Sequence, residues 1–419
     1  MTKPAAIDPR QEKGLALAKG KRARIRHIAG AKYLVPSATE NSGGYVVDVE
    51  AEECSCPDHG ERGVRCKHIW ALFYFRQEVT TPDGNTVVTE AVQTVRVTYA
   101  QNWPAYNAAQ CEEKDRVQAL LRMLCDGIEE PVVQKMGRPR LPIGDAIYCA
   151  AMKVYVGLSS RRASSDLRAC KALGFVDHAP NFSSVCRTME RADLTPILTG
   201  LVEQSARPLS AIETSFAADS TGFATTTYSR WFDKKYGEEK RCQRWIKLHA
   251  MVGTLTNIFT AVRVTESFGT GSGDSPNFPV LVERTAAGGY DMREVSADKA
   301  YLSGPNIAAI ERAGAAPFVP FKSDSTGKGS PAIERMWHLF SLHREDFLAH
   351  YHQRSNVEAT FSAVKRKLGA SLRSRTLDAQ FNETLIKALC FNLSMLVHAI
   401  HELGIDPKFW TATPAGSAQ

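Results

Sequence analysis

The chain has 419 residues, of which 43% are hydrophobic and 23% are charged, and its net charge is +7. This composition is ordinary for a globular protein, and the length allows two or three domains with a sizeable core. The sequence holds no run of about 18 apolar residues, and no apolar stretch follows the charged N-terminus. We therefore expect neither a transmembrane helix nor a signal peptide, and we expect a cytoplasmic protein.

The positive charge is concentrated at the N-terminus. Residues 1–35 hold nine Lys or Arg and two acidic residues, Asp8 and Glu12, so the rest of the chain is nearly balanced. Such a segment is either a solubilising tail or an arm that lies on phosphate groups, and the segment alone favours neither. We expect residues 1–30 to form a flexible basic arm.

Four potential metal ligands lie close together in the sequence. Cys54 and Cys56 form one pair, and Cys66 and His68 form a second pair after nine intervening residues. Zinc takes four nitrogen or sulfur donors in a tetrahedron, and thiols stay reduced in the cytoplasm, so a metal is favoured over a disulfide. A chance cluster is the alternative. We expect one structural zinc ion, because a closed set of four ligands leaves no position for a substrate.

The predicted elements around these ligands form a compact unit. Short strands at 33–35 and 45–47, separated by the turn-rich residues 41–44, precede an apolar helix at 68–75. This arrangement resembles the SWIM zinc finger, found in proteins that bind DNA or other proteins, and the resemblance covers residues 31–78. We expect the dispersed cysteines to be small core residues, and these are Cys111, Cys125, Cys149, Cys170, Cys186, Cys242 and Cys390.

The middle of the chain is predicted to be helical. Residues 79–130 are interpreted as a linker with one strand, at 87–97. Residues 131–208 are interpreted as a helical DNA-binding region, because short helices at this spacing suit a helix-turn-helix-like arrangement. The helices of this region are expected at 143–156, 161–173 and 181–206.

From residue 209 to 405 the pattern predicts an α/β domain, followed by a tail at 406–419. Apolar strands first pair as a meander and then alternate with helices, which is typical of a sheet covered by helices. The expected strands are 216–218, 245–253, 258–265, 295–297 and 318–320. The expected helices are 276–287, 307–313, 333–349, 350–368 and 379–402.

One of these helices carries a stripe of functional side chains. Tyr351, Arg354, Glu358 and Lys365 fall within an arc of about 60° when they are placed on a helical wheel. A stripe of apolar residues runs beside them and would pack the helix against the domain. Pairs of charges on a solvated helix face are the alternative, which explains the charges but not the aligned tyrosine.

This spacing resembles the Tyr-Arg-Glu-Lys signature of DDE transposases from bacterial insertion sequences, over about residues 130–400. The resemblance implies an RNase H-like core, a mixed sheet flanked by helices. In that family one Asp lies on the first strand, a second follows a central strand, and a Glu lies on a later helix. Asp219, Asp298 and Glu358 match these positions, and the resemblance implies that they are catalytic.

Three carboxylates that are distant in sequence suit the cleavage of phosphodiesters. Two Mg²⁺ ions, or Mn²⁺ in their place, would activate a water and stabilise the leaving oxygen. The resemblance further implies that Arg354 and Lys365 hold phosphates, that Tyr351 hydrogen-bonds or stacks there, and that a freed 3′-OH then attacks target DNA. Only 60 residues separate Asp298 from Glu358, which leaves no room for the β-rich insertion that supports hairpin ends in some members.

Several basic residues are weaker candidates for contacts with DNA. The segment 137–140 resembles the minor-groove arm of an AT-hook, with a basic linker as the alternative. Trp231, Lys234 and Lys235 suit DNA-end contacts, although packing of a hairpin on the core explains them equally well. Arg161 and Arg162 open a predicted helix and could contact phosphates, and a basic run beside the proposed site, which includes Arg373 and Arg375, favours DNA backbone binding. The weaker candidates singled out are Arg138, Arg140, Arg161, Arg162, Arg366 and Lys367.

The sequence therefore predicts a nucleoid-associated DNA transposase that binds the ends of a mobile element and cuts and joins strands. Its partners would be double-stranded DNA and a second copy of the chain in the synaptic complex, with no membrane. The first alternative is a catalytically inactive DNA-binding protein derived from a transposase, against which the intact carboxylates argue. The second is a nuclease or resolvase on the same fold, although the zinc module suits sequence-specific end binding better.

Overall fold

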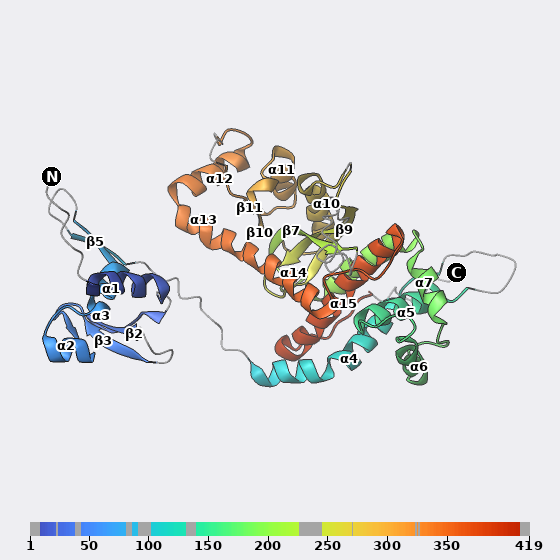
Figure 1. The fold of residues 1–419 in the computed structure, drawn as a ribbon. Coiled ribbons are helices and arrows are strands. Elements are labelled where there is room, and N and C mark those ends of the chain that lie inside the picture. The colour runs from blue at the N-terminus through green and yellow to red at the C-terminus, as the bar shows by residue number, and fades with distance from the viewer. Residues whose placement is uncertain are drawn as a thin grey trace, which may run out of the picture. The chain divides into compact units, whose positions relative to one another are not determined.

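The computed structural model divides the chain into two compact units, residues 1–100 and 101–419, and each is described by itself (Figure 1). The structure describes residues 9–21, 24–37, 43–80, 86–90, 102–130, 140–225, 245–269, 271–322, 325 and 327–410. Some residues named from the sequence lie outside these ranges, namely Arg138, Trp231, Lys234, Lys235 and Cys242.

The first unit is built from an antiparallel sheet and an apolar helix, α3 (Lys67–Phe75), that packs against it. The predicted strands at 33–35 and 45–47 and the helix at 68–75 are confirmed as β2, β3 and α3. The sheet has the order β1 (Arg26–Ala29), β2 (Lys32–Pro36), β3 (Gly44–Asp48) and β4 (Glu53–Cys54). The short helix α2 (Pro57–Arg62) follows β4, and a hairpin of β5 (Arg76–Thr80) and β6 (Thr86–Glu90) follows α3.

Residues 9–20 form a helix, α1 (Pro9–Gly20), which packs on α3. The two helices approach closely at Gly14, where a Cβ atom would lie 2.5 Å from the Cβ of Trp70. Leu17 and Ala18 are buried, and Arg10 pairs with Asp58 at 3.2 Å. The prediction of a flexible basic arm is therefore wrong for these residues, because the few apolar side chains of the segment are enough for one face of a docked helix.

The second unit begins with helices. The first, α4 (Trp103–Asp126), occupies much of the segment that was interpreted as a linker, and Asn102 caps it by accepting the amide of Ala105 at 3.2 Å. The region predicted at 181–206 contains two helices rather than one, because the chain turns at residues 190–193. The helices are α5 (Ile143–Tyr155), α6 (Ser164–Ala172), α7 (Phe182–Met189) and α8 (Leu194–Ala206), and α8 ends in the 3₁₀ turn η2 (Arg207–Leu209).

A five-stranded mixed sheet in the order β11-β10-β7-β8-β9 follows. The antiparallel strands are β7 (Ser215–Ala224), β8 (Trp245–Gly253) and β9 (Phe259–Glu266). On the other side of β7, β10 (Glu294–Ala297) pairs with it in parallel, and β11 (Ala316–Phe318) pairs in parallel with β10. Helix α10 (Asp274–Ala287) connects β9 to β10, and the turn η3 (Lys299–Tyr301) with helix α11 (Gly304–Arg312) connects β10 to β11. This mixed sheet flanked by helices confirms the predicted RNase H-like arrangement.

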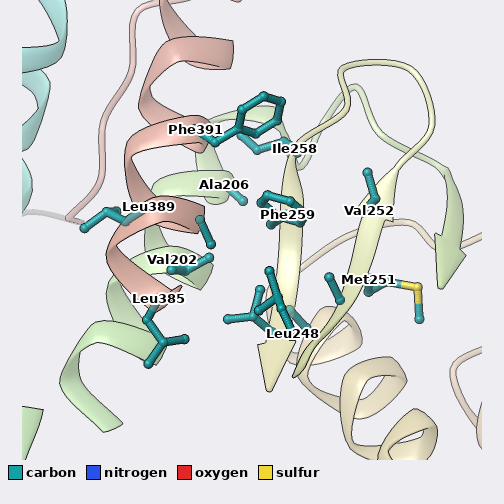
Figure 2. Packing of buried hydrophobic residues seen from close by; sticks show 14 of the residues in the cluster. Val202, Ala206, Leu248, Met251, Val252, Ile258, Phe259, Leu385, Leu389 and Phe391 are labelled. Carbon is teal, nitrogen blue, oxygen red and sulfur yellow. The ribbon is translucent and has the colours of Figure 1, made fainter. Parts of the chain in front are cut away.

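Helix α15 (Leu377–Leu403) lies in the core of this unit. It packs against α4, α5, α8 and β9, and Figure 2 shows Phe391 of α15 beside Ile258, the residue that precedes β9. By length and composition α15 could cross a membrane, but 78% of its most apolar window is buried inside the unit. A helix that is apolar on most sides is also what the core of a large globular unit requires.

A buried amide ties α15 to β9, which is the last strand of the sheet. The Asn392 side chain accepts the amide of Phe259 at 2.8 Å and donates to the carbonyl of Phe259 at 2.9 Å and to that of Val202 at 3.1 Å. The outer edge of a strand has backbone groups that need partners when they are buried. One hydrophobic cluster extends from α4 and α8 to the sheet and α15, so the helices and the sheet share a single core.

The helix predicted at 350–368 is interrupted. Helix α12 (Pro331–Leu342) is followed by α13 (Arg344–Tyr351), the 3₁₀ turn η4 (His352–Arg354) and α14 (Ser355–Leu368). Tyr351 therefore ends one helix, while Glu358 and Lys365 lie on the next. Because a 3₁₀ turn repeats every three residues, the regular helical wheel does not describe the angle between Tyr351 and Glu358.

We expect Gly14→Ala to loosen α1 from α3. Alanine normally stabilises a helix by about 0.5–1 kcal/mol relative to glycine. A loss of protection against hydrogen exchange would therefore come from the close contact with Trp70 and not from helix propensity. Hydrogen exchange of the full-length protein should be faster across α1. Gly20→Ala, whose Cβ would meet nothing within 4 Å, is the matched control and should leave α1 protected. Slower exchange in Gly14→Ala would contradict this packing.

Candidate functional site

The four predicted zinc ligands are brought together by β4, the segment before α2, and the start of α3. The ligand atoms of Cys54, Cys56, Cys66 and His68 lie within 4.8 Å of one another, and all four side chains are buried. Nδ1 of His68 is 3.9 Å from Sγ of Cys54 and 3.8 Å from Sγ of Cys66. Around a tetrahedral zinc these atoms would be about 3.6 Å apart, given the usual Zn–S and Zn–N distances. The four residues therefore fit a zinc ion that His68 would bind through Nδ1.

The surroundings of the cluster favour a thiolate at Cys66. Hydrogen bonds from Cys54 and His68 outweigh burial and lower the pKa of Cys66 to about 3, and the same contact with Cys66 raises the pKa of Cys54. The thiolate is the form that binds metal. The rings of Tyr45 and His68 pack with centroids 4.7 Å apart. Among the described residues Nε2 of His68 is buried without a hydrogen-bond partner, so packing rather than a second hydrogen bond orients this imidazole.

The register of β7 and β10 places Asp219 and Asp298 side by side. Ala218 pairs with Ala297 in the parallel ladder, so the two aspartates are the next residues on strands whose backbones lie about 4.8 Å apart. Each carboxylate accepts the backbone amide of the residue that follows it, at 2.8 Å for Asp219 and 2.6 Å for Asp298. Asp219 lies within β7, because this strand extends beyond the predicted range of 216–218.

Arg354 joins the third predicted carboxylate to the first. Its Nη1 atom is 3.2 Å from Oδ2 of Asp219, and its Nη2 atom is 2.7 Å from Oε1 of Glu358. The Arg354 side chain is 19% exposed and that of Glu358 is 58% exposed, so the site opens to solvent on the side of Glu358. Among the described residues, only the zinc ligands form a group of three or more potential metal-binding atoms within 4.8 Å of one another. At the carboxylates, a guanidinium lies between Asp219 and Glu358.

The surroundings of Asp219 disfavour its charged form on balance. Burial raises the pKa of Asp219, and the carboxylates of Glu358 and Asp274 add to this effect, while the amide of Ser220 and the guanidinium of Arg354 oppose it. A carboxylate that is partly desolvated gains from any cation that enters the site. A cation bound near Asp219 would therefore stabilise the charged form of this carboxylate.

Asp274, at the start of α10, is a charged neighbour of Asp219 that was not predicted from the sequence. Its carboxylate is 2.7 Å from Nζ of Lys247 and 3.3 Å from Nδ1 of His249. Burial would raise the pKa of Asp274, but hydrogen bonds from His249, Lys247 and Ser220 hold it well below its usual range. The helix was predicted to begin at residue 276, which left Asp274 in a loop. An acidic residue just before an apolar helical run is the signal that could have found it.

Tyr351 and Lys365 lie at different distances from Asp219. The guanidinium carbon of Arg354 is 5.9 Å from the ring centroid of Tyr351, so Tyr351 contacts the arginine of the site. Nζ of Lys365 is 5.8 Å from the ring centroid of Phe223 on β7, and burial lowers the pKa of Lys365. Phe223 is four residues, or about 13 Å, along the strand from Asp219. Lys365 therefore lies further along the sheet than Arg354.

The candidates for weaker DNA contacts divide into exposed and paired residues. Lys367 donates to Oε2 of Glu113 at 2.6 Å, and that buried carboxylate also accepts the hydroxyl of Tyr155 at 2.7 Å. This network holds α14 against α4 and α5, so Lys367 neutralises a charge within the protein. Arg161 lies over the Phe182 ring at 5.0 Å. The exposed candidates are Arg140, Arg161, Arg162 and Arg366.

Two family models match the chain, one within each unit. Residues 212–393, which contain Asp219, Asp298 and Glu358, match the family model of the transposase DDE domain. The chain is therefore a protein with a transposase DDE domain, and a transposase role with binding to DNA is what that family implies. More particularly, it combines this domain with a SWIM zinc finger, whose family model matches residues 45–77. No curated protein matched the chain.

Replacing one zinc ligand should remove the metal and unfold the finger. We expect Cys66→Ser to lose about one zinc ion per chain, because a structural zinc site contributes its binding energy to folding. Elemental analysis of the purified full-length protein gives the zinc content. Cys111→Ser, at an exposed cysteine on α4, is the control and should keep the wild-type amount. Equal zinc in Cys66→Ser and wild type would refute the assignment.

Lys367→Met and Arg366→Gln should separate a structural charge from a DNA contact. Removing Lys367 leaves Glu113 buried without its cation, which should cost about 1–3 kcal/mol after allowance for the partial exposure of the pair. Removing the exposed Arg366 should change stability by less than about 0.5 kcal/mol.

For DNA binding we expect the opposite order, with the larger effect in Arg366→Gln and the smaller effect in Lys367→Met. Arg366→Gln should reduce the slope of log K against log salt by about 0.9 if the residue contacts one phosphate. Thermal unfolding and DNA titrations at several salt concentrations measure the two effects. A loss of stability in Arg366→Gln with none in Lys367→Met would contradict the assignment.

Proposed function

We propose that this protein is a DNA transposase that binds the ends of a mobile element and catalyses metal-dependent cleavage and transfer of DNA strands. The observation that carries this proposal is the β7–β10 register, which sets Asp219 beside Asp298 within the DDE domain. Arg354 links Glu358 to the same place. Three acidic residues that are far apart in sequence thus lie on neighbouring elements of this domain, and two of them contact the same guanidinium, which supports the proposal.

The donor set suits Mg²⁺, with Mn²⁺ as a substitute. Carboxylate oxygens are the ligands that Mg²⁺ prefers, and Asp219, Asp298 and Glu358 would hold two ions. Bound there, the ions supply an activated water and neutralise charge on the leaving oxygen. The amides that follow Asp219 and Asp298 fix the orientation of each carboxylate before any ligand enters.

Arg354 has two tasks in this proposal. Without metal its guanidinium balances Asp219 and Glu358. Once divalent ions neutralise these carboxylates, its N–H donors become available to a phosphate of the substrate, and bidentate donors of this kind match phosphate oxygens. Tyr351 would hold the guanidinium from the other side. In the second step the freed 3′-OH of the element would attack a phosphodiester of target DNA at the same carboxylates, and the bond from that phosphorus to the 3′-oxygen of the target strand would break.

The remaining parts of the proposal concern partners and place. The protein would act in the cytoplasm, associated with the nucleoid, and as a homodimer when two element ends are brought together. The zinc ion would be structural. Between Asp298 and Glu358 the described residues hold the helices α11, α12 and α13 and the short strand β11, and a β-rich insertion of the kind that supports hairpin ends is absent from this described part.

The catalytic carboxylates should be separable from DNA binding. Asp219→Asn, Asp298→Asn and Glu358→Gln should each retain binding to the element's end and reduce cleavage in Mg²⁺ or Mn²⁺ about 10²-fold or more, because metal neutralisation supplies several kcal/mol. Asp291→Asn, in the segment that precedes β10 and paired with Arg293 on the surface, is the matched control.

The measurement is nicking of a labelled end sequence by the purified protein. Unimpaired cutting by all three variants would refute the site. Specific binding without cutting by the wild type in either metal would favour the alternative, a DNA-binding protein derived from a transposase.

A further inference from the structure

A small cavity lies in the second unit, at the end of α14. Its volume is about 80 Å³, and it is bounded by the end of α5, the segment that follows α14, and α15. One water needs roughly 10–15 Å³ of such space, so a group of several heavy atoms fits. The charged residues of its lining are Lys153, Arg373, Glu383 and Lys387.

Lys153 is a buried ammonium with a weak partner. Its side chain comes from α5, the residue is 5% exposed, and its Nζ donates to Sδ of Met189 at 3.8 Å. A thioether is a poor acceptor and does not balance a charge. A buried charge is costly unless it is paired, so an anion in the cavity would stabilise Lys153.

Lys387 contributes a second buried ammonium. It is 2% exposed, and its Nζ donates to the carbonyls of Gly369 at 2.7 Å and Ser371 at 2.9 Å. An ammonium has three N–H donors, so it can serve one more acceptor. Burial lowers the pKa of Lys387 to about 8, which leaves it mostly protonated at pH 7.

The carboxylate of the lining does not cancel these charges. Glu383 accepts the backbone amides of Arg373 at 3.0 Å and Ser374 at 2.8 Å, so it is directed at the backbone of the segment that follows α14. Three cationic side chains and one carboxylate leave the cavity with an excess of positive charge.

One lysine of the cavity lining also lies near the sheet, at Phe223. Nζ of Lys387 is 5.1 Å from the centroid of this ring, and Nζ of Lys365 is 5.8 Å from it. Phe223 is about 13 Å along β7 from Asp219, which is the rise of about four nucleotides of a DNA strand. A strand cut at Asp219 therefore has phosphates at the distance of the cavity.

We propose that this cavity is an anion site that takes one phosphate group of the DNA, a few nucleotides from the bond that is cut. The inference that the phosphate belongs to DNA rests on the proposed function, whereas the chemistry of the site requires only a phosphate oxyanion. Lys153 and Lys387 bind its oxygens, and Arg373 closes the site from the solvent side.

The first arm of the test uses inorganic phosphate and the full-length protein without DNA. A ligand that binds only the folded state raises Tm, and we expect a rise of about 2–4 °C in phosphate relative to chloride of equal ionic strength. Lys153→Met should abolish this rise and, without phosphate, should unfold at the same or a higher temperature than wild type. Lys328→Met, at an exposed position, should keep the rise. Should Lys153→Met fail to fold, Arg373→Gln replaces it.

The second arm measures binding of duplex DNA at several salt concentrations without divalent metal. Lys153→Met should lower the slope of log K against log salt by about 0.9, which is the effect of one phosphate contact. A lost phosphate effect with an unchanged slope would support the anion site with free phosphate as its ligand, and would overturn DNA as the source.

The absence of any phosphate effect in wild type, or its retention in Lys153→Met, would overturn the anion site itself. Neither arm requires cleavage, so a protein that binds phosphate here and cuts no DNA would overturn the proposed function and leave this site standing.

Discussion

The parallel pairing of β7 with β10 is the constraint on which the candidate active site depends. Because successive side chains of a strand alternate between the faces of the sheet, a shift of β10 by one residue would turn Asp298 away from Asp219. The register is fixed from both sides. β8 pairs with β7 along its full length, and β11 pairs in parallel with the outer side of β10. Two carboxylates can therefore lie side by side although they are 79 positions apart in the sequence.

Such a pair of carboxylates needs compensating charge, and the surrounding residues supply it in two ways. Arg354 contacts Asp219 and Glu358 directly, in positions where divalent ions would compete with it. Asp274 would add a further negative charge, but Lys247 on β8 neutralises it, and His249 on the same strand also contacts it. The protein thus balances Asp274 permanently and balances the proposed catalytic carboxylates with a single side chain that other cations can displace.

The sequence predicted the features that rest on local periodicity and spacing. The zinc ligands, the strands of the sheet and the helix with Glu358 were all found because each has a short signal of its own. Residues that depend on distant partners were not found. Nothing local distinguishes Lys367, whose partner Glu113 is 254 positions away, from its exposed neighbour Arg366. Likewise the basic composition of the N-terminal segment gave no sign that Gly14 lets α1 rest on Trp70, and the turn at 352–354 depends on tertiary contacts of η4 with β7 and β10.

The shared core has a consequence for how DNA would be held. The sequence analysis separated a helical region at 131–208 from a catalytic domain at 209–405, but α8 and α5 belong to the same hydrophobic cluster as β9 and α15. Asn392 binds the backbone of α8 and β9 together, and Glu113 joins α4 and α5 to α14. Interiors packed in this way deform little. DNA bound by exposed arginines of the helices would therefore be placed at a fixed distance from Asp219, and cleavage position would follow from the fold rather than from a flexible link between two domains.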